Sequence, residues 1–158
     1  MKYTIIIILA ISLIAAGIFL IIHFAYADKI DLPANFAAVD KDNLDGYKVR
    51  GISADGVVIA LRSEDNPENG TLDFWTKAIE NEVTGRGYKL TESEKITSNA
   101  GQDGMMMTFS TDILSESFTY ITAIYVKSKQ VLVVEAGGKA DAVKEHLPAL
   151  QKAILSVR

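Results

Sequence analysis

The sequence contains few residues at the spacings that catalysis requires. Ser53 lies in the pattern G-x-S-x-x-G, one residue longer than the G-x-S-x-G turn that exposes a serine nucleophile. Gly138-Lys139 matches the end of a phosphate-binding loop, but Val133 replaces the first glycine of that loop and Ala140 replaces its hydroxyl residue. We therefore expect neither a serine hydrolase nor a nucleotide site.

Metal ligands are equally scarce. The chain has no Cys and two histidines, and His23 lies at the end of an apolar N-terminal segment. This leaves His146 without a second His or Cys to complete a metal site, and we expect it on the solvated surface of a helix. Met105, Met106 and Met107 follow one another in an expected strand, where neighbours point to opposite faces and cannot converge on one ion. No cofactor is expected.

Carboxylates are the one abundant chemical group, with 20 Asp and Glu residues. Pairs of them could serve as general acid and base, and only their separation in a structure would show it. Asp40, Asp42 and Asp45 are spaced as in a calcium loop, but that loop needs a ligand at Leu44 and a glycine at Asp45. A solvated linker is the favoured interpretation, with weak cation binding left open.

The residues from Ile5 to Ile22 form an 18-residue run without a charge. A helix of that length covers about 27 Å, close to the roughly 30 Å hydrocarbon core of a bilayer. Lys2 precedes the run and acidic residues follow it, which predicts a cytoplasmic N-terminus and an extracytoplasmic remainder. Residues 1–27 are therefore either a single-pass inner-membrane anchor or a signal peptide cleaved between Ala27 and Asp28 to release a periplasmic or secreted protein.

The remaining 131 residues (158 − 27) have the size of one domain. They carry 15 basic and 20 acidic residues, a formal charge of −5, which argues against a nucleic-acid partner. Without Cys, the fold must depend on its hydrophobic core. We expect residues 28–45 to be a linker and residues 46–158 to form a single α+β domain.

The domain is predicted to begin with a hairpin followed by a helix. Strands at 47–53 and 57–62 flank Asp55-Gly56, and a two-residue loop there would place Ile52 opposite Ile59. Residues 63–70 are rich in turn formers and are expected to be a surface loop. Thr71 is a candidate N-cap for a helix that ends near Gly85 and has Trp75 on its apolar side.

Four strands and a second helix are expected next, with the strands at 88–97, 105–111, 118–127 and 130–136. The short connections between these strands imply that neighbouring strands are antiparallel. Two of these strands are apolar on both faces and should be covered on both, which predicts a three-layer α/β/α sandwich. Apolar residues recur at helical spacing from 143 to 157, and Pro148 is expected to kink or break that last helix.

The segments GYKVRGISADGVVIALR (46–62), FWTKAIENEVTGRGYKLTE (74–92) and VLVVEAGG (131–138) resemble those of small exported or membrane-anchored bacterial proteins of unassigned role. The order of elements is similar to that of the PsbP-like fold. This resemblance implies a mainly antiparallel sheet between helices and binding to larger assemblies without shared catalysis. No metal-binding residue of PsbP can be matched to a residue of this chain.

Three functional hypotheses follow. The first is a non-enzymatic, exported or membrane-tethered accessory domain that docks on a membrane-associated assembly through a protein partner. The second is a periplasmic small-ligand binder with a pocket between sheet and helix, lined by Trp75 and Tyr125. The third is an enzyme built on carboxylates and tyrosines, which requires two carboxyl groups about 5 to 9 Å apart in one cleft.

Overall fold

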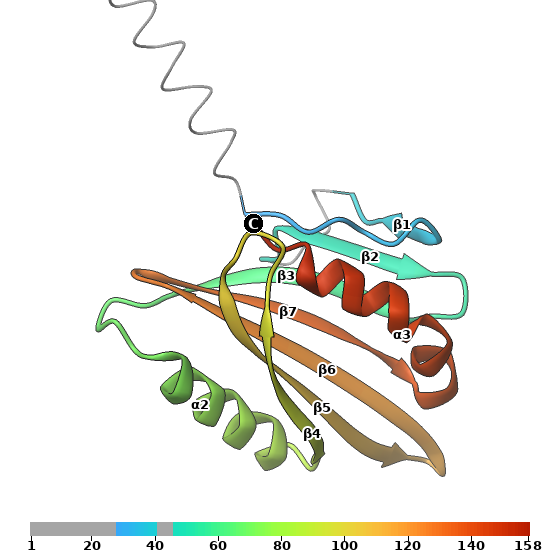
Figure 1. Ribbon diagram of the computed structural model, residues 1–158. Helices are drawn as coiled ribbons and strands as arrows, with labels where there is room; N and C mark the ends of the chain where they lie inside the picture. The colour runs from blue at the N-terminus through green and yellow to red at the C-terminus, as the bar shows by residue number, and fades with distance from the viewer. Residues whose placement is uncertain (1–27, 41–45) are drawn as a thin grey trace, which may run out of the picture.

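The computed structural model describes residues 28–40 and 46–158 (Figure 1). The expected anchor or signal at residues 1–27, with Ile5, Ile22 and Ala27, lies outside the described residues, and so do Asp42 and Asp45. Within the described part of the chain, no helix combines the length and the apolar character that crossing a membrane requires.

Seven strands form one sheet in the order β1-β2-β3-β7-β6-β5-β4, and every neighbouring pair is antiparallel (Figure 1). The strands are β1 (Phe36–Ala38), β2 (Val49–Ser53), β3 (Val58–Asp65), β4 (Lys89–Thr97), β5 (Asp103–Ile113), β6 (Glu116–Lys127) and β7 (Gln130–Lys139). The four strands expected after the first helix are present. The expectation of a mainly antiparallel sheet is confirmed.

In the described part of the chain two helices accompany this sheet, α2 (Leu72–Gly85) and α3 (Ala140–Leu155). Thr71 is the N-cap of α2, since its hydroxyl accepts a hydrogen bond from the Phe74 amide at 3.2 Å. The expected break at Pro148 is corrected, because α3 runs through that residue without interruption. Burial of Leu150, Ala153 and Ile154 against the sheet holds the second half of α3 in place.

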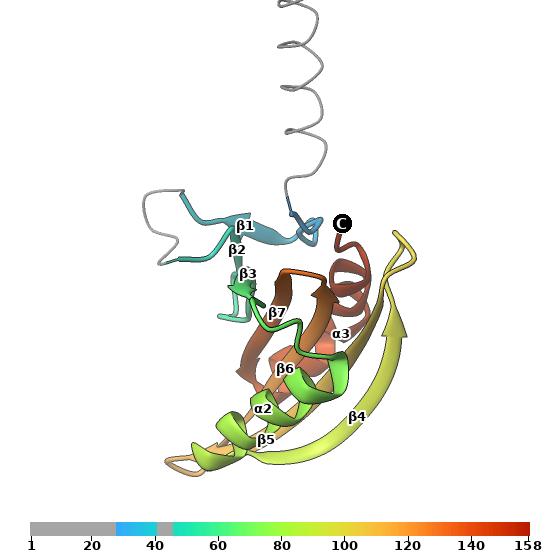
Figure 2. The same ribbon diagram turned by 90° about the vertical axis from the view of Figure 1, so that its left-hand side faces the viewer.

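Alternate residues of the central strands pack against different helices. On β6, Ile121, Ala123 and Tyr125 share a buried cluster with α3. Ile124, from the other face of the same strand, belongs to a second cluster that includes α2 residues such as Ile79. Figures 1 and 2 give two views of α2 and α3 around the sheet. This double burial explains why β6 and β7 are apolar on both faces.

The β2–β3 hairpin has a different register from the predicted one. Gly51 pairs with Ile59 and Ile52 with Val58, whereas a two-residue loop would have paired Ile52 with Ile59. The loop has three residues between Ser53 and Val57, whose backbones are hydrogen-bonded, and its last residue, Gly56, has a φ of 87°. A glycine with positive φ at the end of a three-residue loop is a common hairpin solution.

The described part of the expected linker belongs to the domain. Phe36 to Ala38 form β1, which pairs with β2, and both Ile30 and Phe36 are buried in the α3 core. Asp28 forms ion pairs with Lys48 at 2.5 Å and Lys127 at 2.7 Å. Burial of these apolar side chains holds residues 28–40 against the sheet, so the linker interpretation is corrected for them.

The surface loop predicted at residues 63–70 is shorter than expected. β3 continues to Asp65, which pairs with Gln130 of β7. Asn66 follows and is buried, with 2% of its surface exposed. Its turn is fixed by hydrogen bonds from the side-chain amide to Gly70 O at 3.1 Å and from Gly70 N to Asn66 Oδ1 at 2.7 Å. A run of turn-forming residues in the sequence does not show at which residue the pairing of β3 with β7 ends.

Candidate binding trough beside helix α2

Helix α2 packs mainly over β4, β5 and β6 and leaves part of the same sheet face open. The open part carries the even-numbered residues of β2 and β3 and the odd-numbered residues of β7, including Arg50, Val58, Ala60 and Glu135. Two adjoining cavities lie there, of about 330 Å³ and about 480 Å³. We call them together the α2 trough.

The two cavities share five lining residues, which are Tyr47, Val83, Arg86, Tyr120 and Glu135. The smaller one, here the Arg50 cavity, is further lined by Arg50, Val58, Ala60, Tyr88, Ala136 and Gly137. The larger one, here the Trp75 cavity, is further lined by Arg62, Glu64, Trp75, Ile79 and Glu82. Small side chains at Val58, Ala60 and Gly137 leave the space that the Arg50 cavity occupies.

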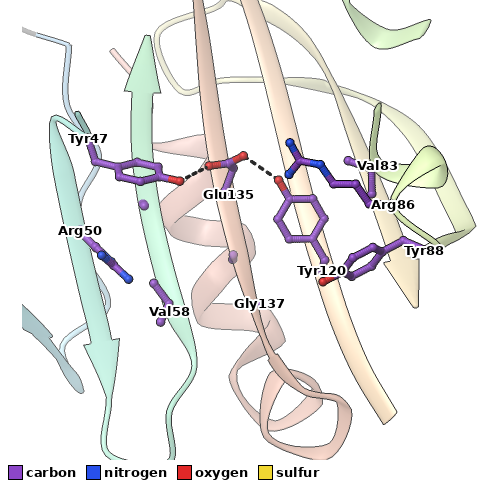
Figure 3. Close-up of a pocket in the computed structure, with 11 residues that line it drawn as sticks. Tyr47, Arg50, Val58, Val83, Arg86, Tyr88, Tyr120, Glu135 and Gly137 are labelled. Carbon is purple, nitrogen blue, oxygen red and sulfur yellow. Dashed lines mark hydrogen bonds between the residues drawn. The ribbon is translucent and has the colours of Figure 1, made fainter. Parts of the chain in front are cut away.

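Glu135 lies at the centre of the α2 trough and accepts hydrogen bonds from several donors. The Tyr47 hydroxyl donates to Oε2 at 2.9 Å and the Tyr120 hydroxyl donates to Oε1 at 2.7 Å. Figure 3 shows the two hydroxyls approaching the carboxylate from either side. Arg62 adds an ion pair, with Nε 3.3 Å from Oε2. A carboxylate this well bonded is stable in a site where only 17% of its side chain is exposed.

The same contacts fix the protonation of the donors. Burial raises the pKa of Tyr120, and the negative charge of Glu135 raises it further. The pKa of Tyr47 is raised by the same two causes. Burial alone would lower the pKa of Arg62, but Glu135 outweighs that effect and raises it. The phenols and the guanidinium therefore remain donors at neutral pH.

Aromatic rings form one wall of the trough. Tyr120 packs against Tyr88 with ring centroids 5.9 Å apart and against Phe109 with centroids 6.1 Å apart. Such tilted contacts are favourable between aromatic side chains. They hold the Tyr120 ring so that its hydroxyl is directed at Glu135 (Figure 3).

Trp75 and Tyr125 are not brought together. Trp75 lines the Trp75 cavity, and its indole N–H donates to Asn66 Oδ1 at 3.1 Å. Tyr125 is fully buried in the cluster formed with α3, and its hydroxyl donates to the Ile154 carbonyl at 3.0 Å. The two rings belong to buried clusters on different sides of the sheet. The expected pocket lined by both is therefore corrected: of the two residues, Trp75 lines a cavity and Tyr125 does not.

Sequence reasoning missed the group at the centre of the trough. Glu135 follows four buried apolar residues, Val131 to Val134, on β7. A single carboxylate inside such a strand must have partners, because an unpaired buried charge is very unfavourable. This charge within an apolar strand was the available signal. The partners of Glu135 could not be found from it, because they lie far away in the sequence; Tyr47, for example, precedes Glu135 by 88 residues.

The structure corrects the expected environment of His146. Its side chain is only 15% exposed, and its Nε2 lies 3.0 Å from both carboxylate oxygens of Asp55. Its Nδ1 is 3.1 Å from Asn35 Nδ2, and its ring makes an edge contact with Phe36. His146 therefore joins α3 to β1 and to the β2–β3 turn, instead of being a solvated helix residue.

The other candidate residues take structural roles. Ser53 Oγ donates to Asp55 and accepts a hydrogen bond from the Val57 amide at 2.9 Å, so it fixes the hairpin turn. Met106 packs in the α3 cluster, whereas Met105 and Met107 pack in the α2 cluster, as alternation predicted. Among the described residues, no three His, Asp or Glu side chains are grouped so as to hold a metal ion.

Comparison with known proteins gives structural neighbours only. No family model and no curated protein matches the sequence. LpqN of Mycobacterium tuberculosis, described as involved in cell envelope biogenesis, matches with a TM-score of 0.63 and 13% identity over 80% of this chain and 79% of LpqN. The cyanobacterial PsbP protein CyanoP of Synechocystis sp. PCC 6803 matches with a TM-score of 0.57 and 13% identity over 82% of this chain and 84% of CyanoP.

The fold is PsbP-like. A third neighbour, PA94 of Pseudomonas aeruginosa, a protein of unknown function and putative regulator, matches at a TM-score of 0.50 and 11% identity over 79% of this chain and 97% of its own. At such identities the likeness extends to the fold alone. It supports the PsbP-like expectation that the element order raised, and it transfers no function from any neighbour.

Proposed function

We propose that this chain is a non-enzymatic accessory domain of the cell envelope that works by binding. Its scaffold would be a three-layer PsbP-like sandwich, exposed on the extracytoplasmic side and either tethered by residues 1–27 or released after Ala27. Its working surface would be the α2 trough, which would hold part of a membrane-associated assembly.

The observation that carries the proposal is the state of Glu135. Its carboxylate receives two phenol hydrogen bonds and an arginine ion pair. Both carboxylate oxygens of Glu135 are therefore already bonded to side chains from β3, β6 and the segment before β2. Among the residues lining the trough, this central group orders the walls of a binding surface.

The neighbours support the cellular setting of this proposal. LpqN is described as involved in cell envelope biogenesis, and CyanoP is a cyanobacterial PsbP. A PsbP-like domain outside the cytoplasm agrees with the charge pattern around residues 5–22. We infer from this that the chain assists a larger assembly instead of carrying out chemistry itself.

A second candidate is a small-ligand-binding protein, and the cavities favour it specifically. A pocket of roughly 300 Å³ is the lower size for small-molecule sites, and the two cavities measure about 330 Å³ and about 480 Å³. A ligand in the trough is compatible with docking on an assembly, since the ligand can be a group that the assembly presents.

Native purification tests the proposal. The protein is extracted from its own cells in mild detergent, its intact mass is measured, and co-eluting components are identified. A mass that includes residues 1–27, together with a stoichiometric membrane partner, is the expected result for a tethered accessory domain. A chain that starts at Asp28 and elutes alone would contradict membrane docking and leave the small-ligand candidate.

A further inference from the structure

The turn between β5 and β6 presents two apolar side chains to solvent. Leu114 is 95% exposed, more than any other large apolar residue in the described ranges, and its neighbour Ile113 is 49% exposed. Ile113 pairs with Glu116, so residues 113–116 form a two-residue hairpin turn, which we call the β5–β6 tip. The Leu114 side chain adds almost nothing to the hydrophobic core, because it buries almost no surface.

The backbone of this tip is also unfavourable for the residues that it carries. Leu114 has a φ of 51° and Ser115 has a φ of 67°, and both values lie in the left-handed region, where a β-carbon causes strain. Asn-Gly would form the same turn more favourably. Strained residues of this kind cluster at functional sites. Leu114 is thus unfavourable for the isolated fold, which indicates a contact with another molecule.

The strands below the tip hold it in a fixed position. β5 and β6 are paired without interruption up to the turn. At its base, Ser117 Oγ donates to Asp112 Oδ1 at 2.6 Å, and Lys139 Nζ pairs with Glu116 Oε1 at 2.7 Å. An apolar group that is presented on a rigid support loses little conformational freedom on binding, which favours association.

The tip lies far from the first described residue. Asp28 accepts a hydrogen bond from Lys127 at the end of β6, whereas Glu116 begins that strand. β6 has 12 residues, so its ends are about 36 Å apart at roughly 3.3 Å per residue. Figures 1 and 2 show Asp28 and the tip at opposite ends of the sheet. In the tethered form proposed above, the membrane therefore lies at the Asp28 end and not at the tip.

The charges around the tip are mainly acidic. Asp112 and Glu116 flank the two apolar residues in the sequence, and Lys139 pairs with Glu116. The anionic surface of a bilayer attracts basic segments and repels an acidic rim of this kind. Such a rim suits a protein pocket that is apolar inside and carries Lys or Arg at its edge.

We propose that the β5–β6 tip is a docking point for a protein partner, which receives Ile113 and Leu114 in an apolar pocket with basic residues at its edge. Tyr120 lines the α2 trough and lies on β6 about 13 Å from Glu116. One partner can therefore cover the trough and the tip together. This inference rests on the proposed binding role of the trough and adds a second contact for the same partner.

Photo-crosslinking in intact cells tests the inference on the full chain. Benzoylphenylalanine replaces Leu114 at the tip, Glu82 in the trough or Ser128 in the β6–β7 turn. Ser128 is the matched control, since it is exposed in the two-residue turn at the other end of β6. We expect positions 114 and 82 to give adducts with the same protein and position 128 to give none. Mass spectrometry should place the adduct from position 114 among apolar residues of that protein.

Two variants show whether the apolar side chain matters. Leu114→Asn with Ser115→Gly keeps the turn and removes the apolar group, so it should lower the crosslink yield from position 82 about tenfold. Leu114→Met keeps an apolar side chain of similar volume and should crosslink like the wild type. Thermal unfolding should show the Asn-Gly variant to be at least as stable as the wild type, so unfolding would not explain a lost crosslink.

Four results would overturn the inference. They are lipid adducts from position 114, no protein adduct there, equal yields from positions 114 and 128, and an unchanged yield from position 82 in the Asn-Gly variant. Failure here is separate from failure of the proposed function. Adducts from position 82 without any from position 114 would leave the trough standing and remove only the tip, whereas the absence of adducts at both positions would contradict the accessory role as well.

Discussion

At the scale of single residues, the protein depends on long-range polar contacts that its sequence conceals. Glu135 receives donors from Tyr47, Arg62 and Tyr120, residues that lie 88, 73 and 15 positions away. Asp28 is similarly held by Lys127, 99 positions away. Local patterns can mark a charge in an apolar strand as unusual, but they do not identify its partners.

Replacing Glu135 with Gln should destabilise the fold. The neutral amide loses the ion pair with Arg62 and can no longer accept two phenol hydrogen bonds as strongly, and we expect a loss of about 1 to 3 kcal/mol in the free energy of unfolding. Urea unfolding followed by the fluorescence of Trp75, the chain's single tryptophan, measures it.

Glu64→Gln is the control for that substitution. Glu64 also pairs with Arg62, but 46% of its side chain is exposed, so its loss should change stability by less than about 0.5 kcal/mol. Equal effects of the two substitutions would show that Glu135 is not the centre of the network.

Asp28→Asn should lower stability in a pH-dependent way. Burial alone would raise the pKa of Asp28, but hydrogen bonds from Lys127 and Lys48 outweigh it and lower the pKa below 3.8. A carboxyl with a lowered folded-state pKa adds stability above its unfolded pKa, and that stability is lost as pH falls through the folded value. We expect the wild type to exceed Asp28→Asn by about 1 kcal/mol at pH 7, because the two ion pairs are partly exposed.

Acid unfolding of the two proteins measures this difference, which should shrink once the pH falls below about 4. Asp65→Asn is the control, since it makes the same substitution at an exposed aspartate at the end of β3. A gap between wild type and Asp28→Asn that persists at low pH would mean that the carboxylate charge is not its source.

At the scale of elements, helices and strands were predicted well and their connections poorly. The helix after Thr71 ends at Gly85 as its capping and glycine pattern indicated. The β2–β3 register was missed by one residue, because Asp55-Gly56 fits both a two-residue and a three-residue loop. Pro148 was expected to kink or break the last helix, and no break occurs, because apolar contacts on both sides of it keep α3 continuous.

The β5–β6 hairpin carries a strained turn that can be relieved. Leu114 and Ser115 both have positive φ, at 51° and 67°, although neither is glycine or asparagine. Asn-Gly is the preferred pair for such a turn. Leu114→Asn with Ser115→Gly should therefore stabilise the protein by about 1 kcal/mol in urea unfolding.

Leu114→Ala distinguishes strain relief from removal of an exposed apolar side chain, since Leu114 is 95% exposed. Alanine keeps the β-carbon and the unfavourable positive φ, so we expect no gain from it. A gain from alanine as large as that from the Asn-Gly pair would contradict the strain explanation.

At the scale of the whole molecule, a mainly antiparallel sheet could be predicted from the sequence, whereas the α2 trough could not. Strands that are apolar on both faces indicated a sheet that is covered on both sides, and the two buried clusters agree with that inference. The trough exists because α2 lies mainly over β4 to β6 and leaves β2 and β3 open beside it. The offset of a helix across a sheet depends on side-chain packing between distant segments, which periodicity does not specify.

We propose that the α2 trough, and not the α3 side of the domain, is the surface through which this protein binds its partner. Site-specific photo-crosslinking in intact cells tests it most directly, with benzoylphenylalanine replacing either Glu82 on α2 or Glu145 on α3. Both residues are exposed helix glutamates, so the two substitutions remove the same charge, but only Glu82 lines the trough. Crosslinked products from position 82 and none from position 145 are the predicted result. Products from position 145 alone, or equally from both, would contradict the assignment of the trough as the working surface.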